Sequence, residues 1–107
     1  MKLSYVLSLI TVAFLAILSA SAGLMLGDVD RIPMHWNLNG VPNSYAPKRT
    51  GLIVIPAFGL VTMIGLAVSE KGNPRNRQIR ATITVALILI AVHAFFLYSV
   101  LGHANKL

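Results

Sequence analysis

Three long stretches of this sequence lack charged residues, and this feature restricts the possible folds more than any other. Residues 3–26, 51–69 and 81–101 contain no aspartate, glutamate, lysine or arginine. Each stretch is close to the roughly 20 residues that a helix needs to cross a bilayer, and a helix pairs its backbone groups within one segment. The sequence therefore predicts an all-α integral membrane protein with three transmembrane helices, over about residues 3–27, 51–69 and 79–102.

The composition indicates the same class of protein. The chain of 107 residues is 56% hydrophobic and 11% charged, with a mean hydropathy of +0.75, which a water-soluble fold could not accommodate. The connections at residues 28–50 and 70–78 leave no room for a soluble module, so residues 1–107 are expected to form a single three-helix membrane domain. Glycine and proline between Glu70 and Pro74 predict a tight turn, which would join the last two helices as an antiparallel hairpin.

The first apolar stretch also has features of a cleavable secretory signal. Lys2 precedes the apolar run, and the small residues Ala20, Ser21 and Ala22 imitate a cleavage site. The apolar run continues through residues 24–26, however, instead of stopping at the small residues. We therefore expect an uncleaved first helix, with cleavage as the alternative.

Basic residues near the helix ends indicate the orientation, because lysine and arginine are retained on the cytoplasmic side. With three spans, the N-terminus and the loop 70–78 share one side of the membrane. This side has five basic residues against four, which predicts a plasma-membrane protein with a cytoplasmic N-terminus and an extracytoplasmic loop 28–50. The first group comprises Lys2, Lys71, Arg75, Arg77 and Arg80, and the second comprises Arg31, Lys48, Arg49 and Lys106.

The net charge of +6 does not predict a nucleic-acid partner, because the basic residues are divided between two membrane faces and form no long run. The lipid bilayer itself is the expected partner. Anionic headgroups would meet the basic residues of the second loop, Lys71, Arg75, Arg77 and Arg80.

Small residues in the first span predict a close helix contact. Ala16, Ala20, Gly23 and Gly27 lie on much the same helix stripe, at spacings of three or four residues. Such a stripe can pack against another helix of the same chain, against a second copy, or against a larger membrane complex.

Pro56 interrupts the hydrogen bonding of the second apolar stretch one turn earlier. The sequence therefore predicts either a kink or a shifted helix start between Gly51 and Ile55.

His93 lies near the middle of the third span, where an ionisable side chain is costly and is by default a functional candidate. It can serve either as a hydrogen-bonded packing residue or as a proton relay or ligand contact. Hydroxyl groups on neighbouring helices are suitable partners, for example those of Thr11 and Thr62. No acidic residue lies in any span to complete a relay.

The connection at residues 28–50 is long for a compact domain and is therefore either functional or disordered. Its composition predicts order, because prolines fix backbone angles, Gly40 permits a tight turn, and Trp36 and Tyr45 are side chains typical of the headgroup level. We expect an ordered loop that folds over the outer helix ends. The prolines are Pro33, Pro42 and Pro47.

Neither a metal site nor a catalytic site is predicted. Asp28, Asp30, His35 and His103 could lie on one side of the bundle, but their spacing matches no strong metal motif. Ser44 and His35 lack a third member or an oxyanion motif, and the chain has no cysteine. We expect no cofactor and no enzymatic activity.

The loop carries a motif that resembles a known family. The pattern Pro33-x-His35-Trp36-Asn37-x-x-Gly40-x-Pro42-Asn43-x-Tyr45-x-x-Lys48, followed by Pro56, is similar to the N-terminal domain of unknown function of SdpI-type bacterial immunity proteins. In that family the stretch joins the first two membrane helices, so the resemblance implies a membrane fold with an outward recognition loop. Two features depart from the family: Asn43 stands where aspartate is common, and the immunity proteins carry a further multi-helix domain.

These observations support two main hypotheses. The first is a recognition, immunity-like or signalling membrane protein that binds a peptide or toxin through its outer loop. The alternative is a structural or accessory subunit of a larger membrane complex, or a homo-oligomer, that packs through the stripe of small residues. A transporter is disfavoured, because the spans lack acidic residues. The candidate recognition residues are Pro33, His35, Trp36, Asn37, Gly40, Pro42, Tyr45 and Lys48.

Overall fold

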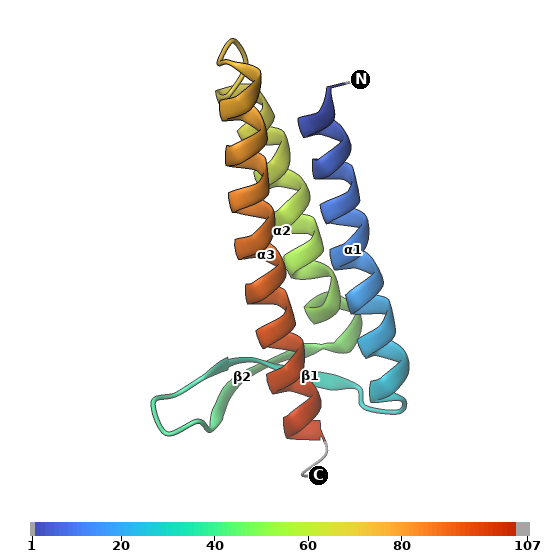
Figure 1. The fold of residues 1–107 in the computed structure, drawn as a ribbon. Helices are drawn as coiled ribbons and strands as arrows, with labels where there is room; N and C mark the ends of the chain where they lie inside the picture. Colours follow the sequence, from blue (N-terminus) through green and yellow to red (C-terminus); the bar gives the residue numbers. More distant parts are fainter. Residues whose placement is uncertain (1, 105–107) are drawn as a thin grey trace.

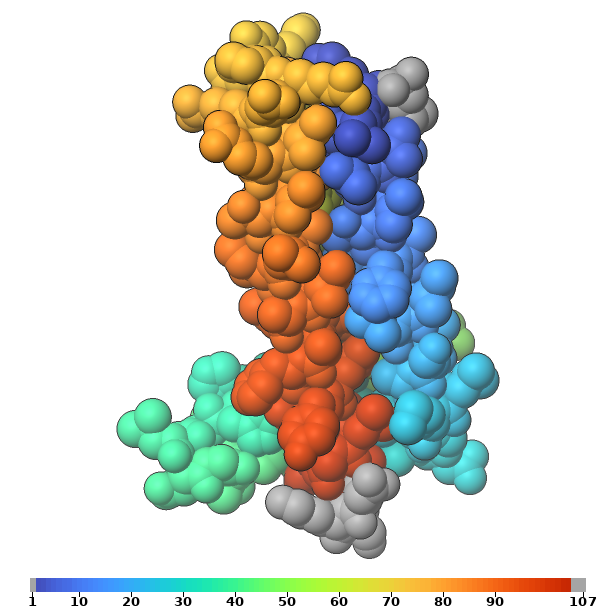
Figure 2. All heavy atoms as spheres, in the orientation of Figure 1, coloured from blue at the N-terminus to red at the C-terminus, as the bar shows by residue number. Residues whose placement is uncertain are grey.

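Three helices lie side by side, and a two-stranded hairpin crosses one end of them (Figure 1). The computed structural model describes residues 2–104. Figure 2 shows α1 and α3 in contact along one face of the bundle, with the hairpin projecting to one side. The elements are α1 (Leu3–Leu26), β1 (Arg31–Trp36), β2 (Pro42–Pro47), α2 (Lys48–Ser69) and α3 (Arg75–Ala104).

The predicted membrane fold is confirmed, because all three helices are long and apolar enough to cross a bilayer. The longest dimension of the described chain is 50 Å, which spans the roughly 40–45 Å of a bilayer with its headgroups. Large apolar side chains point outward from every helix, among them Ile17, Phe58 and Leu87, each more than half exposed. In lipid this is the favourable arrangement, so the protein is membrane-embedded.

The core of the bundle is built around α1, which packs against both other helices. Leu15 is completely buried and forms a cluster with Met63 of α2 and with Ala86 and Leu89 of α3. Gly59 allows the close approach of α2, because a Cβ atom there would lie 2.7 Å from Leu15 Cδ1. Small residues thus set the α1–α2 distance, as is common in membrane bundles.

The helix ends differ from the predicted ones. The first helix ends at Leu26, and Gly27 adopts a φ of +57° at its C-cap. The second begins at Lys48, directly after β2, and continues through Pro56. Of the two alternatives that Pro56 suggested, a kink or a shifted start between residues 51 and 55, the shifted start is therefore not seen. The third begins at Arg75, because Pro74 can precede a helix but cannot continue one. Lys106, which was included in the charge balance, lies outside the described residues.

The connection between α1 and α2 is ordered, as predicted, but it forms strands that were not foreseen. β1 and β2 pair antiparallel, with Pro33 opposite Tyr45 and Trp36 opposite Pro42. The register shifts on both sides of His35, with one extra residue on β1 at Met34 and one on β2 at Asn43. The hairpin is therefore a folded element at one end of the bundle, the same end as the C-terminal part of α3 (Figure 1).

Candidate functional site

The turn of the hairpin is organised by Asn37. Its side-chain oxygen accepts hydrogen bonds from the backbone N–H of Asn39 at 2.9 Å and of Val41 at 3.0 Å. Its own backbone N–H donates to the Val41 carbonyl, and Gly40 adopts a φ of +78° that favours glycine. Asn37 and Gly40 therefore determine the shape of the turn.

His35 is paired across the hairpin with Asn43. The distance from His35 Nδ1 to Asn43 Oδ1 is 2.8 Å, and both side chains are exposed. Because an amide oxygen can only accept, Nδ1 donates this bond. A carboxylate at position 43 could accept the same bond.

Trp36 joins the hairpin to α3. Its ring lies edge-on against Phe96, with 6.4 Å between the centroids and an angle of 78°. Phe96 in turn stacks on the His93 ring, again with 6.4 Å between centroids. Trp36 therefore packs on the end of the bundle that the hairpin covers, and the rings of Trp36, Phe96 and His93 form a continuous row that extends into the membrane span.

Lys48 ties the end of the hairpin to α1. Its ammonium group donates to the Gly27 carbonyl at 2.6 Å, which satisfies one of the unpaired carbonyls at the C-terminus of α1. A cation is also favoured at this end of a helix dipole. The Lys48 backbone N–H donates to the Asp30 carbonyl at 2.8 Å, so two bonds close the base of the hairpin.

The remaining motif residues contact the bundle to different extents. Pro33 is buried, Pro42 is half-buried, and the Tyr45 hydroxyl lies 3.3 Å from Nε2 of His103 on α3. Ile32, which no motif identified, is completely buried and packs where Gly51 leaves space on α2. The hairpin is thus anchored to all three helices.

The tip of the hairpin carries exposed apolar side chains that sequence reasoning missed. Leu38 is fully exposed and Val41 is 55% exposed. Both lie in the unspecified positions of the motif, next to Asn37 and Gly40. The sequence shows them as two apolar residues within a polar turn. Their exposure at the tip follows only from the hairpin fold.

The residues considered for a metal site do not form a cluster in the described chain, whereas Ser44 and His35 are cross-strand neighbours. Within residues 2–104, no three histidine, cysteine, aspartate or glutamate side chains lie close enough to hold a metal ion. His35 is engaged by Asn43 and His103 by Tyr45. Ser44 lies opposite His35 in the strand register.

His93 is completely buried between α3 and α1, with Nε2 2.8 Å from the Ser19 hydroxyl oxygen. The partner is therefore a hydroxyl group, but neither of the two named in advance. The Thr11 hydroxyl instead donates to the Leu7 carbonyl on its own helix, and Thr62 makes no hydrogen bond to His93. Among the described residues, Nδ1 of His93 has no hydrogen-bond partner.

The stripe of small residues on α1 is divided between two roles. A Cβ atom on Gly23 would lie 3.2 Å from Leu52 Cδ1, so Gly23 is at the α2 contact. Ala16 and Ala20 are exposed and line a groove of about 320 Å³ between α1 and α2. Gly27 does not belong to this packing face, because it ends the helix and a Cβ atom there would meet no atom within 4 Å.

These features define a small multi-pass helical membrane protein with a β-hairpin docked on one end of its bundle. Residues 29–60 match a family model described as Domain of unknown function (DUF1648). The match covers less than a third of the chain, but it contains the whole hairpin and the first half of α2. No curated protein and no solved structure matches this chain.

Proposed function

We propose that this protein is a recognition protein of the membrane surface, immunity-like or signalling, whose hairpin binds a peptide or a peptide toxin. The observation that carries the proposal is the combination of a firmly anchored hairpin base with an exposed apolar tip. Leu38 and Val41 are held out by the turn that Asn37 and Gly40 form. Exposed apolar residues on an ordered support are suited to binding a partner.

The contacts of the motif divide its residues into two groups. Pro33, Trp36, Asn37, Gly40 and Lys48 shape or anchor the hairpin. The ligand would instead meet other exposed side chains of the hairpin, among them His35, Leu38, Asn39, Val41, Asn43, Ser44 and Tyr45. The resemblance to SdpI-type immunity proteins supports a peptide as the ligand. The proposal includes no catalytic, metal-dependent or cofactor-dependent step.

The proposed orientation puts the hairpin outside the cytoplasm. The end of the bundle opposite the hairpin has five basic residues. The segment 28–50 and the C-terminal residues of the sequence together have four. The positive-inside rule therefore supports a cytoplasmic N-terminus in the plasma membrane.

A protection assay tests the recognition role. Cells that express the protein are challenged with a panel of membrane-active bacterial peptides, and the inhibitory concentration of each peptide is measured. We expect the wild type to raise this concentration for at least one peptide, and the double variant Leu38→Ser/Val41→Ser to lose the effect. Asn76→Ser is the control, because it changes an exposed polar residue at the opposite end of the bundle and leaves the hairpin intact. Full protection by the double variant, inserted at the wild-type level, would refute the proposal.

The groove beside Ala16 and Ala20 favours a second candidate, an accessory subunit of a larger membrane complex. Small exposed residues beside a groove allow another helix to approach closely. After gentle detergent extraction, this hypothesis predicts a fixed ratio to larger proteins in gel filtration, which Ala20→Leu should abolish. Repeated elution of the wild-type chain alone would count against it.

A further inference from the structure

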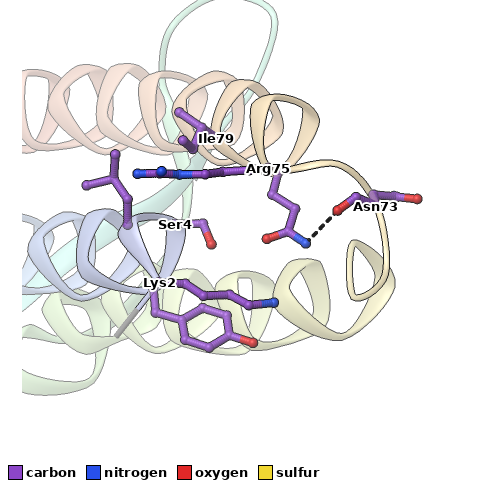
Figure 3. Close-up of a pocket in the computed structure, with 8 residues that line it drawn as sticks. Lys2, Ser4, Asn73, Arg75 and Ile79 are labelled. Carbon is purple, nitrogen blue, oxygen red and sulfur yellow. Dashed lines mark hydrogen bonds between the residues drawn. The ribbon is translucent and has the colours of Figure 1, made fainter.

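A polar cleft opens at the end of the bundle opposite the hairpin, between the first turns of α1 and α3 (Figure 3). Its volume is about 850 Å³. Its polar lining comes from three segments, the start of α1, the α2–α3 turn and the start of α3. These residues are Lys2, Ser4, Asn73, Arg75 and Gln78.

The two cations of the cleft have no carboxylate partner among the described residues. Glu70 is the only acidic residue of the sequence at this end of the bundle, because the other two, Asp28 and Asp30, lie next to the hairpin. Its carboxylate accepts a hydrogen bond from the Asn73 amide and lies 3.6 Å from Arg77 Nε. Lys2, whose ammonium lies 5.5 Å from the centroid of the Tyr5 ring, and Arg75 therefore bring two positive charges without a carboxylate partner to one cavity, from the starts of α1 and α3.

The buried side chain of Gln78 holds the segment next to Arg75 in place. Gln78 Nε2 donates to the Glu70 carbonyl at 3.1 Å and to the Asn73 carbonyl at 2.9 Å. These bonds fix the α2–α3 turn against the start of α3. Arg75 is therefore presented by an ordered helix end, and its cleft persists without a rearrangement of the turn.

Apolar residues complete the cleft on the side of the membrane. Leu3 and Ile79 line it, and the uncharged part of α3 begins at Ala81. The cavity therefore lies at the boundary between headgroups and hydrocarbon, with cations on one side and apolar side chains on the other. This polarity matches that of a phospholipid.

We propose that the cleft binds the phosphate of an anionic phospholipid, with Lys2 and Arg75 as its cationic ligands. Basic pockets between membrane helices are suited to such headgroups. A zwitterionic lipid carries its own cation and compensates the two charges less well. The site lies at the opposite end from the hairpin, so it is independent of the proposed recognition role.

Native mass spectrometry of the full-length protein in mild detergent tests this site. Phosphatidylglycerol and phosphatidylcholine are added in parallel, and the lipid-bound fraction is measured for each. We expect a clear preference for phosphatidylglycerol and a loss of about 30-fold in its affinity for Lys2→Gln/Arg75→Gln. This figure follows from about 1 kcal/mol for each basic residue near an anionic surface.

The double variant Lys71→Gln/Arg80→Gln is the matched control. It removes the same charge from the same end, but neither residue lines the cleft. An equal loss in both double variants would overturn the site, because it would indicate diffuse attraction by the whole surface. Gel filtration and circular dichroism establish that both variants keep the fold. Displacement of phosphatidylglycerol by inorganic phosphate alone would overturn the assignment to a lipid.

Discussion

Gly51 determines how closely β1 can approach α2. A Cβ atom at this position would lie 2.5 Å from Ile32 Cδ1, 2.8 Å from Ile32 Cγ1 and 2.9 Å from Met34 Sδ. Ile32 is completely buried, and both its terminal Cδ1 and its Cγ1 lie within 3.0 Å of this position, so a rotation of the side-chain end alone would not remove the overlap. One methyl group at residue 51 would therefore push the hairpin away from the bundle.

We predict that Gly51→Ala lowers the free energy of unfolding by about 1–3 kcal/mol, the usual cost of overpacking. The measurement is detergent-induced unfolding followed by circular dichroism. Gly65→Ala is the control, because a Cβ atom there would meet nothing within 4 Å. Equal stability of the two variants would show that Ile32 does not need the space at Gly51.

The chemical type of the hydrogen-bond partner of His93 could be predicted from the sequence, but the partner residue could not. The sequence indicated that a buried imidazole needs a hydroxyl or carbonyl partner, and the structure supplies Ser19 at 2.8 Å. The identity of the partner depends on how α1 is rotated about its axis. Thr11, Leu15 and Ser19 all lie on the buried face of α1. The position of His93 along the bundle axis determines which of these residues it meets.

The helices were predictable because a helix that crosses a bilayer needs a minimum length and apolar side chains, whichever residues it packs against. The strands were not, because proline within a run argues against a strand. In a two-stranded hairpin both strands are edges, so the N–H that Pro33 or Pro42 lacks can be missing on the outer side. The prolines of this connection, which indicated only an ordered loop over the helix ends, are therefore also compatible with a two-stranded sheet.

The candidate site was predictable only in part, for a related reason. The motif identified Trp36, Asn37 and Lys48, whose contacts now explain them as supports of the hairpin. Leu38 and Val41 could not be selected, since apolar residues in a membrane protein usually face lipid or core. Only the geometry of the turn shows that they point away from the bundle's core.

At the level of the hairpin, we predict that Asn37→Ala loosens the turn while the helices stay intact. The variant loses the two bonds to the backbone of Asn39 and Val41, each contributing about 1 kcal/mol. Hydrogen exchange measured by mass spectrometry should be on the order of tenfold faster across residues 31–47. Asn39→Ala serves as the control, because the Asn39 side chain makes no hydrogen bond within the described chain. Unchanged exchange in Asn37→Ala would contradict this role.

For the whole molecule, the orientation can be measured with single cysteines, because the chain has none of its own. Asn39 lies at the hairpin turn, and Asn76 is exposed at the opposite end. A membrane-impermeant maleimide should label Asn39→Cys in intact cells and Asn76→Cys only after permeabilisation. The reverse pattern would place the hairpin in the cytoplasm. An introduced cysteine is a better labelling site than the native Lys48, because the Lys48 ammonium donates a hydrogen bond to the Gly27 carbonyl.

The aromatic row at the hairpin end has a spectroscopic consequence. Trp36 is the single tryptophan of the chain and lies against Phe96 at the boundary between the hairpin and α3. Its emission therefore comes from one place, the joint between the two elements. Undocking of the hairpin would expose the indole ring to water and shift the emission to longer wavelengths, whereas separation of the helix ends opposite the hairpin would leave the emission unchanged. The protein thus contains its own optical reporter of hairpin docking, without any added label.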